Sequence, residues 1–197
     1  MKYTALAVKV KTGLQGYWLA AAAICTPERA AEVERAFSAM EKTELFWPED
    51  PIELDLRLAE LIGRYCPPGV PAAAAVLAAA GREASTGGVI GSPRHQPRSA
   101  YGGLEELAED LTLWSRPGGP GFVFAGSSDR AGELRDRFLD RERQNLQLNP
   151  DERYELFTRC LQEDPPDAWL YAADGSGREQ RGILAAGSGR EITLIKL

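Results

Sequence analysis

Residues 168–197 (AWLYAADGSGREQRGILAAGSGREITLIKL) carry more information about the fold than any other stretch of the chain. Apolar runs alternate there with two glycine-rich segments, and both segments contain the sequence GSGRE, at 175–179 and 187–191. Repeated glycine-rich segments between short apolar runs are typical of turns that join antiparallel strands. We therefore interpret the repeat as turn chemistry and predict a β-meander. Its predicted strands are 168–172, 182–186 and 191–197.

The amino end of the chain predicts a second β-structure. Residues 2–10 (KYTALAVKV) alternate in side-chain direction, and residues 17–25 form another apolar run after the glycine-containing segment 11–16. This spacing predicts a β-hairpin. The residues between the hairpin and the meander are mainly helical in pattern. We predict an α+β fold, with the hairpin and the meander in one antiparallel sheet covered by the helical middle. A doubly wound α/β sheet is the alternative.

Helix starts are well marked in the middle of the chain. The sequence 26–28 offers a capping threonine, a proline at the first helical position and an acid in the first turn. The sequence 149–152 (NPDE) adds a glutamate at the capping-box position. Two more helices are predicted, from Asp50-Pro51 to Tyr65 and after residues 126–129. Apolar residues spaced by three and four predict the buried faces. They include Val33, Phe37, Met40, Leu134, Phe138, Tyr154, Phe157 and Leu161.

Three further segments have weaker patterns. Residues 71–81 (PAAAAVLAAAG) are compatible with a helix or a strand, and the high helix propensity of alanine favours the helix that we predict. Residues 104–114 carry leucines and a tryptophan at helical spacing, which predicts another helix. Residues 84–103 contain five glycines and two prolines and are predicted to form one long loop.

The composition is that of an ordinary soluble protein. The 197 residues fit one domain, predicted to span 1–197. The formal net charge is −6, and the acidic excess lies in residues 26–60 and 101–164. Nonspecific nucleic-acid binding is not expected, because it depends on basic surfaces. No apolar run reaches the ~18 residues of a membrane span, so we expect no membrane partner and a cytoplasmic location.

Few residues are available for catalysis or metal binding. The chain has one histidine, five lysines and three cysteines. Cys25, Cys66 and Cys160 are far apart in the sequence, which favours a reducing compartment over a disulfide framework. Zinc ligands usually come in close pairs, so we predict no metal site. No phosphate-binding glycine motif and no nucleophile motif occurs, and no cofactor is expected.

The predicted long loop contains one candidate binding group. Arg94, His95 and Arg98 lie close together there, and Tyr101 follows them. The three basic side chains would suit an anion or an RNA backbone, and the tyrosine ring would suit stacking on a base. A solvent-facing loop without a ligand is the simpler interpretation.

Two other candidates lie at predicted helix ends. Ser127, Ser128 and Arg130 stand at a helix start, where free N–H groups favour an anion, although a plain N-cap loop is the simpler interpretation. Trp47 stands at a helix end, where an exposed ring would anchor a partner. Packing beneath the neighbouring prolines is the alternative for Trp47.

The scarcity of histidine and lysine favours a protein that is not an enzyme. We expect a small acidic module that docks on a protein partner with a basic surface and inhibits or regulates it, as immunity proteins and defence inhibitors do. One alternative is a nucleotide- or RNA-directed enzyme or binding protein that uses residues 94–101 and the Ser127-Ser128 helix start. Another is an accessory subunit of a larger assembly, joined through an open strand edge.

Overall fold

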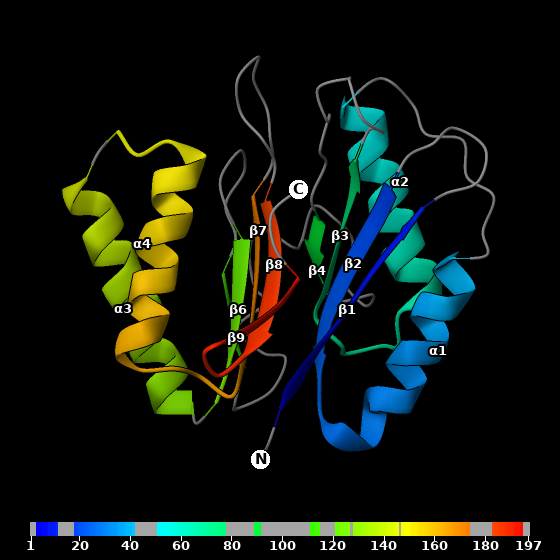
Figure 1. Ribbon diagram of the computed structural model, residues 1–197, viewed down its shortest axis with the longest axis horizontal. Helices are drawn as coiled ribbons and strands as arrows, with labels where there is room; N and C mark the ends of the chain where they lie inside the picture. Colours follow the sequence, from blue (N-terminus) through cyan, green and yellow to red (C-terminus); the bar gives the residue numbers. More distant parts are fainter. Residues whose placement is uncertain are drawn as a thin grey trace.

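The fold has four layers, in which two helix pairs enclose two β-sheets (Figure 1). The computed structural model describes residues 3–11, 18–41, 51–77, 89–91, 111–114, 121–126, 128–145, 147–173 and 183–194. The first half of the chain contains β1 (Thr4–Lys11), β2 (Trp18–Cys25), η1 (Pro27–Arg29), α1 (Ala30–Glu41), α2 (Pro51–Tyr65), β3 (Ala72–Leu77) and β4 (Val89–Gly91). The second half contains β5 (Leu111–Trp114), β6 (Gly121–Ala125), α3 (Ser128–Gln144), α4 (Pro150–Glu163), β7 (Ala168–Ala173), β8 (Ile183–Ser188) and β9 (Glu191–Leu194).

Each half supplies one sheet. The strand orders are β1-β2-β3-β4 and β5-β6-β7-β8-β9, and every neighbouring pair is antiparallel. The mixed α+β class, the amino-terminal hairpin and the carboxyl-terminal meander are thus confirmed, and the antiparallel pairing excludes the doubly wound alternative. The hairpin and the meander lie in two facing sheets, which differs from their predicted placement in one sheet.

Two sheets form because the central strands are apolar on both faces. On β2, Ala20, Ala22 and Ile24 face the opposite sheet, while Leu19 and Ala21 face the helices. The layer between the sheets is rich in alanine, whose small side chain lets two sheets approach closely. One hydrogen bond also joins the sheets: the backbone N–H of Ala5 on β1 donates to Ser188 Oγ at the end of β8, at 3.2 Å.

The helices cover the outer faces of the sheets as their patterns predict. Val33, Phe37 and Met40 of α1 are buried against the first sheet, and corresponding apolar residues of α3 and α4 are buried against the second. The predicted capping box of α4 is present, because Asn149 Oδ1 accepts from the Glu152 N–H and Glu152 Oε2 accepts from the Asn149 N–H, both at 2.9 Å. Burial of one apolar stripe therefore fixes how each helix is rotated on its sheet.

Three local predictions were wrong. Residues 72–77 form β3 and not a helix, because pairing with β2 and burial on both faces outweigh the helix propensity of alanine. Residues 111–114 form β5, paired with β6, although their spacing predicts a helix. Residues 89–91 form β4 at the edge of the first sheet, within the region predicted as one loop. The other residues of 84–103 and residues 104–110 lie outside the described residues.

The two halves repeat one another in element order and in sequence. Each contains two strands, two helices and two further strands, and the second half adds β9. The sequence 26–37 (TPERAAEVERAF) aligns with 127–138 (SSDRAGELRDRF) without a gap. GRE and GS also recur at the same separation, at 81–83 and 91–92 and again at 177–179 and 187–188. Equivalent positions include Arg29 and Arg130, Glu32 and Glu133, Val33 and Leu134, and Phe37 and Phe138.

Candidate docking surface on the helical layers

Most of the residues predicted to bind lie outside the part of the chain that the structure describes. They are Trp47, Arg94, His95, Arg98, Tyr101 and Ser127. Ser128 is the first residue of α3, and Arg130 stands in the first turn of that helix. The loop and tryptophan sites therefore stay predictions, and only Arg130 can be placed by its contacts.

Arg130 is already engaged within its own half. Its guanidinium forms an ion pair with Asp164, which directly follows α4. The equivalent Arg29 donates from Nη1 to the Pro68 carbonyl oxygen, just after α2, at 3.0 Å. Both arginines thus tie the start of the first helix to the segment that follows the second helix. These similar connections give Arg130 a structural role, whereas the Ser127–Arg130 anion site stays a prediction.

Ion pairs bridge α3 and α4 on the outer surface, beside a hollow of about 460 Å³ that is lined by Arg141, Leu156, Arg159, Gln162 and Glu163. Glu163 accepts hydrogen bonds from Arg141 Nη1 and Nη2 at 2.9 and 3.0 Å, and Arg137 Nη1 lies 3.6 Å from Glu163 Oε2. These bonds lower the pKa of the Glu163 carboxyl, chiefly through its hydrogen bonds with Arg141. Near the other end of the pair, Arg153 Nε lies 2.6 Å from Oε1 of the buried Glu142. The second helix pair therefore satisfies most of its charges internally.

The first helix pair leaves a groove open between α1 and the end of α2. This α1–α2 groove has a volume of about 720 Å³. It is lined by Glu28, Ala31, Glu32, Arg35, Ala36, Ala39, Arg64, Tyr65, Cys66, Pro67 and Pro68. Alanines supply the lining on the α1 side, and Ala36 occupies the position that Arg137 occupies in the second half. Counted from Pro51 and Pro150, Arg64 likewise occupies the position of Glu163.

The two carboxylates of the groove already have partners. The pKa of Glu28 is lowered because its own backbone N–H and then the Thr26 hydroxyl hydrogen-bond to its carboxylate. Thr26 therefore holds Glu28 and makes no capping bond of its own to η1. Glu32 Oε2 accepts from Arg29 Nε at 3.0 Å. Both carboxylates are thus held at the η1 end of the groove.

The two arginines that line the groove have no carboxylate partner among the residues that the structure describes. Arg35 Nε donates to the Ala31 carbonyl oxygen of its own helix at 3.1 Å. Arg64, in the last turn of α2, is exposed. Among the described residues, no carboxylate lies within ion-pair distance of either guanidinium. Both side chains therefore keep donor groups available to a ligand.

The buried cysteines do not make this groove a catalytic centre. Cys66 borders the groove, and burial raises the pKa of its thiol to about 12. Burial also raises the pKa values of Cys25 and Cys160. The thiolate is the reactive form, so thiols in these surroundings are poor nucleophiles and metal ligands. No group of three or more His, Cys, Asp or Glu residues that could hold a metal occurs in the described ranges.

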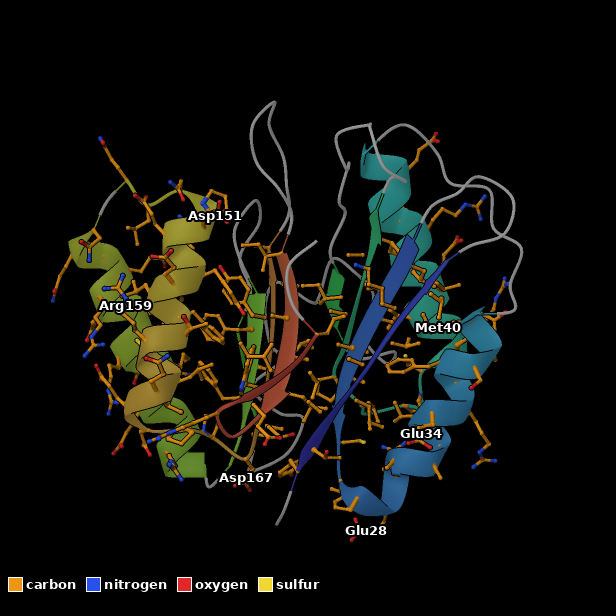
Figure 2. The ribbon with its side chains drawn as sticks, viewed as in Figure 1. Glu28, Glu34, Met40, Asp151, Arg159 and Asp167 are labelled. Carbon is orange, nitrogen blue, oxygen red and sulfur yellow. The ribbon has the colours of Figure 1, made fainter. Side chains whose placement is uncertain are left out.

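The helices present mainly acidic side chains to solvent. Among their described side chains, twelve acidic residues and five arginines are exposed, and the other six arginines are only partly exposed. Figure 2 labels Glu28 and Glu34 on the first helical layer and Asp151 and Arg159 on the second. Partly buried arginines tie the helices together, because their long apolar stems pack well. The carboxylates are left on the outer surface.

Comparison with protein-family models, curated proteins and solved structures finds no match to this chain. In the described part of the chain, no helix combines the length and the apolar character needed to cross a membrane.

The residues of the α1–α2 groove were missed at the level of sequence. Arg35 and Arg64 belong to different helices, and no local pattern brings them to one surface. The alignment of 26–37 with 127–138 contained a sequence signal for a difference between the halves, because it pairs Ala36 with Arg137. That difference between equivalent positions marks the part of the helical surface where the halves diverge.

Proposed function

We propose that this protein is a nonenzymatic binding protein, a small acidic module that docks on a protein partner with a basic surface. Binding inhibits or regulates that partner, in the manner of an immunity protein or a defence inhibitor. The observation that carries the proposal is the excess of exposed carboxylates on the helices, with twelve exposed acidic residues against five exposed arginines among the described side chains. Such a surface accelerates association with a basic partner and loses this effect as salt is added.

The described chemistry supports binding more than catalysis. The cysteine thiols are buried with raised pKa values, and the groove is lined by small residues and guanidinium groups. A nucleotide- or RNA-directed role receives no support from Arg130, because that side chain is paired with Asp164. The helical surface is therefore the region in which we place the contact with the partner.

Cross-linking in native lysate, followed by mass spectrometry, would identify the partner and the cross-linked helices. The purified partner would then be titrated with this protein at about 50 mM and about 500 mM salt. We expect at least tenfold weaker binding at the higher salt, because exposed charges are screened within about 4 Å at that ionic strength. We also expect the activity of the partner to change on binding. Salt-independent binding would count against the proposal.

Charge-neutral variants locate the contact. Glu34→Gln, Glu133→Gln and Glu155→Gln each remove one exposed charge, from α1, α3 and α4 respectively. Glu191→Gln on β9 is the matched control, since it removes an equally exposed charge away from the helices. We expect at least one helical variant to bind about two- to fivefold more weakly. Equal binding by all four variants would contradict docking through the helical layers.

A further inference from the structure

The internal repeat allows one helix pair to be compared with the other. In the second half, the Glu163 carboxylate is held by Arg141 and Arg137 on the outer surface between α3 and α4. In the first half, the position equivalent to Glu163 is Arg64, and the position equivalent to Arg137 is Ala36. Both helix pairs have a hollow on this surface, of about 720 Å³ in the first half and about 460 Å³ in the second, but among the described residues only the second contains an arginine–carboxylate pair.

In the described part of the chain, the groove offers guanidinium donors without a carboxylate partner, while its two carboxylates have partners. Glu28 and Glu32 are held by Thr26 and Arg29, whereas Arg35 and Arg64 have no carboxylate partner among the described residues. A guanidinium binds a carboxylate through two parallel N–H···O bonds, which is the arrangement seen between Arg141 and Glu163. The missing component of the first half is therefore a carboxylate.

We propose that the α1–α2 groove binds a carboxylate side chain from an acidic segment of the protein partner, between Arg35 and Arg64. The origin of this carboxylate rests on the proposed docking function. The partner surface would then combine basic residues, which meet the exposed carboxylates of the helices, with one acidic segment that enters the groove. Such a mixed charge pattern fixes the position of the partner on the helical surface, which exposed charges of one sign alone would not do.

The equivalent site of the second half favours a carboxylate over a phosphate as the ligand, because the arginines there hold the Glu163 carboxylate. Glu28 and Glu32 lie at one end of the groove, and both have partners. A phosphate group with nearly two charges meets the repulsion of these carboxylates and the attraction of Arg35 and Arg64 about twice as strongly as a carboxylate with one charge, so the choice between them is left to the shape of the site. The net charge of −6 also opposes any anion at long range, so binding of an acidic peptide must come from local contacts.

A hexaglutamate peptide is a suitable probe for the full-length protein. Its binding would be followed by NMR, through the side-chain Nε–H signals of the arginines. We expect saturable shifts at Arg35 and Arg64, and at least about fivefold weaker binding by Arg35→Ala and by Arg64→Ala. Arg64→Glu introduces the residue type of the second half and should abolish binding. Because Arg64 is exposed, these variants are expected to fold, which circular dichroism would confirm.

Arg159→Ala is the matched control. Arg159 is an exposed helical arginine whose Nε donates to the Glu155 carbonyl oxygen of its own helix, as Arg35 does to Ala31, but it lies in the second half. Unchanged peptide binding by this variant supports the groove. Equal weakening by Arg159→Ala, or undiminished binding by Arg64→Glu, would overturn the inference. Stronger binding of inorganic phosphate than of the peptide would overturn it as well.

The identified partner separates the two proposals. If the partner binds in a salt-dependent manner but binds Arg64→Glu as tightly as the native protein, the groove inference fails and the docking function stands. If the peptide binds in the groove but no salt-dependent partner contact exists, the docking function fails and the groove remains a carboxylate site.

Discussion

Replacement of Phe157 by alanine tests how the second half is held together. Phe157 is fully buried on α4, and its ring centroid lies 4.7 Å from that of Tyr171 and 5.4 Å from that of the stacked Phe124. Three more aromatic rings surround it within 5.8 Å. Truncation of a buried phenylalanine lowers the free energy of unfolding by about 3–5 kcal/mol. Because Phe157→Ala also removes many ring contacts, we expect a loss of about 4 kcal/mol. A chain of this size then loses roughly 8–16 °C in Tm.

Urea unfolding followed by far-UV circular dichroism would measure the loss. Phe157→Leu is the companion variant, because it keeps most of the apolar volume and removes only the ring contacts. We expect Phe157→Leu to lose about 1–1.5 kcal/mol and Phe157→Ala about three times as much, with similar m-values. A loss below about 1.5 kcal/mol for Phe157→Ala, or equal losses in both variants, would refute the view that a tightly packed ring cluster stabilises this half.

Three other outcomes follow from local geometry. Gly187→Ala should destabilise the fold by about 2 kcal/mol or more, because a Cβ there would lie 2.0 Å from a backbone oxygen. Its control Gly132→Ala, a helical site with no atom within 4 Å of a Cβ, should stabilise by up to about 1 kcal/mol in the same melts. Cys66 should resist a thiol reagent in the native state at pH 8 and react after unfolding, because its pKa is about 12. Glu163→Gln should have a lower Tm than the native protein at pH 7, because Arg141 lowers the folded-state pKa of Glu163 and so stabilises the fold while Glu163 is ionised. In melts at decreasing pH, this difference in Tm should disappear as the pH falls through the folded-state pKa of Glu163.

Local signals predicted the elements whose residues are close in sequence. The capping box of α4 needs only Asn149 and Glu152, and both predicted hydrogen bonds are formed. The hairpin and the meander follow from apolar runs separated by glycine-containing turns, and both are present. These features were predictable because their main contacts lie within one turn or one hairpin.

The arrangement of the sheets depends on contacts that no local pattern contains. Residues 72–75 are alanines with high helix propensity, yet all four are buried, alternately against the helices and against the other sheet. Whether a two-faced apolar strand joins one sheet or faces another depends on what covers its second face. The groove escaped prediction for the same reason, because Arg35 and Arg64 come to line one groove only after α1 and α2 pack on the first sheet.

The comparison of the halves separates positions that are alike from positions that differ in charge. The positions that carry the same residue in both halves stabilise the fold. Arg29 and Arg130 connect the helix starts to the segments that follow the second helices, and Phe37 and Phe138 are buried. The positions that differ in charge lie on the outer helical surface, where Arg64 stands in place of Glu163. Both helix pairs have a hollow on their outer surface, but an ion pair between Arg141 and Glu163 lies in the hollow of the second pair. The two guanidinium groups of the α1–α2 groove have no carboxylate partner among the described residues, so binding variants should be concentrated there.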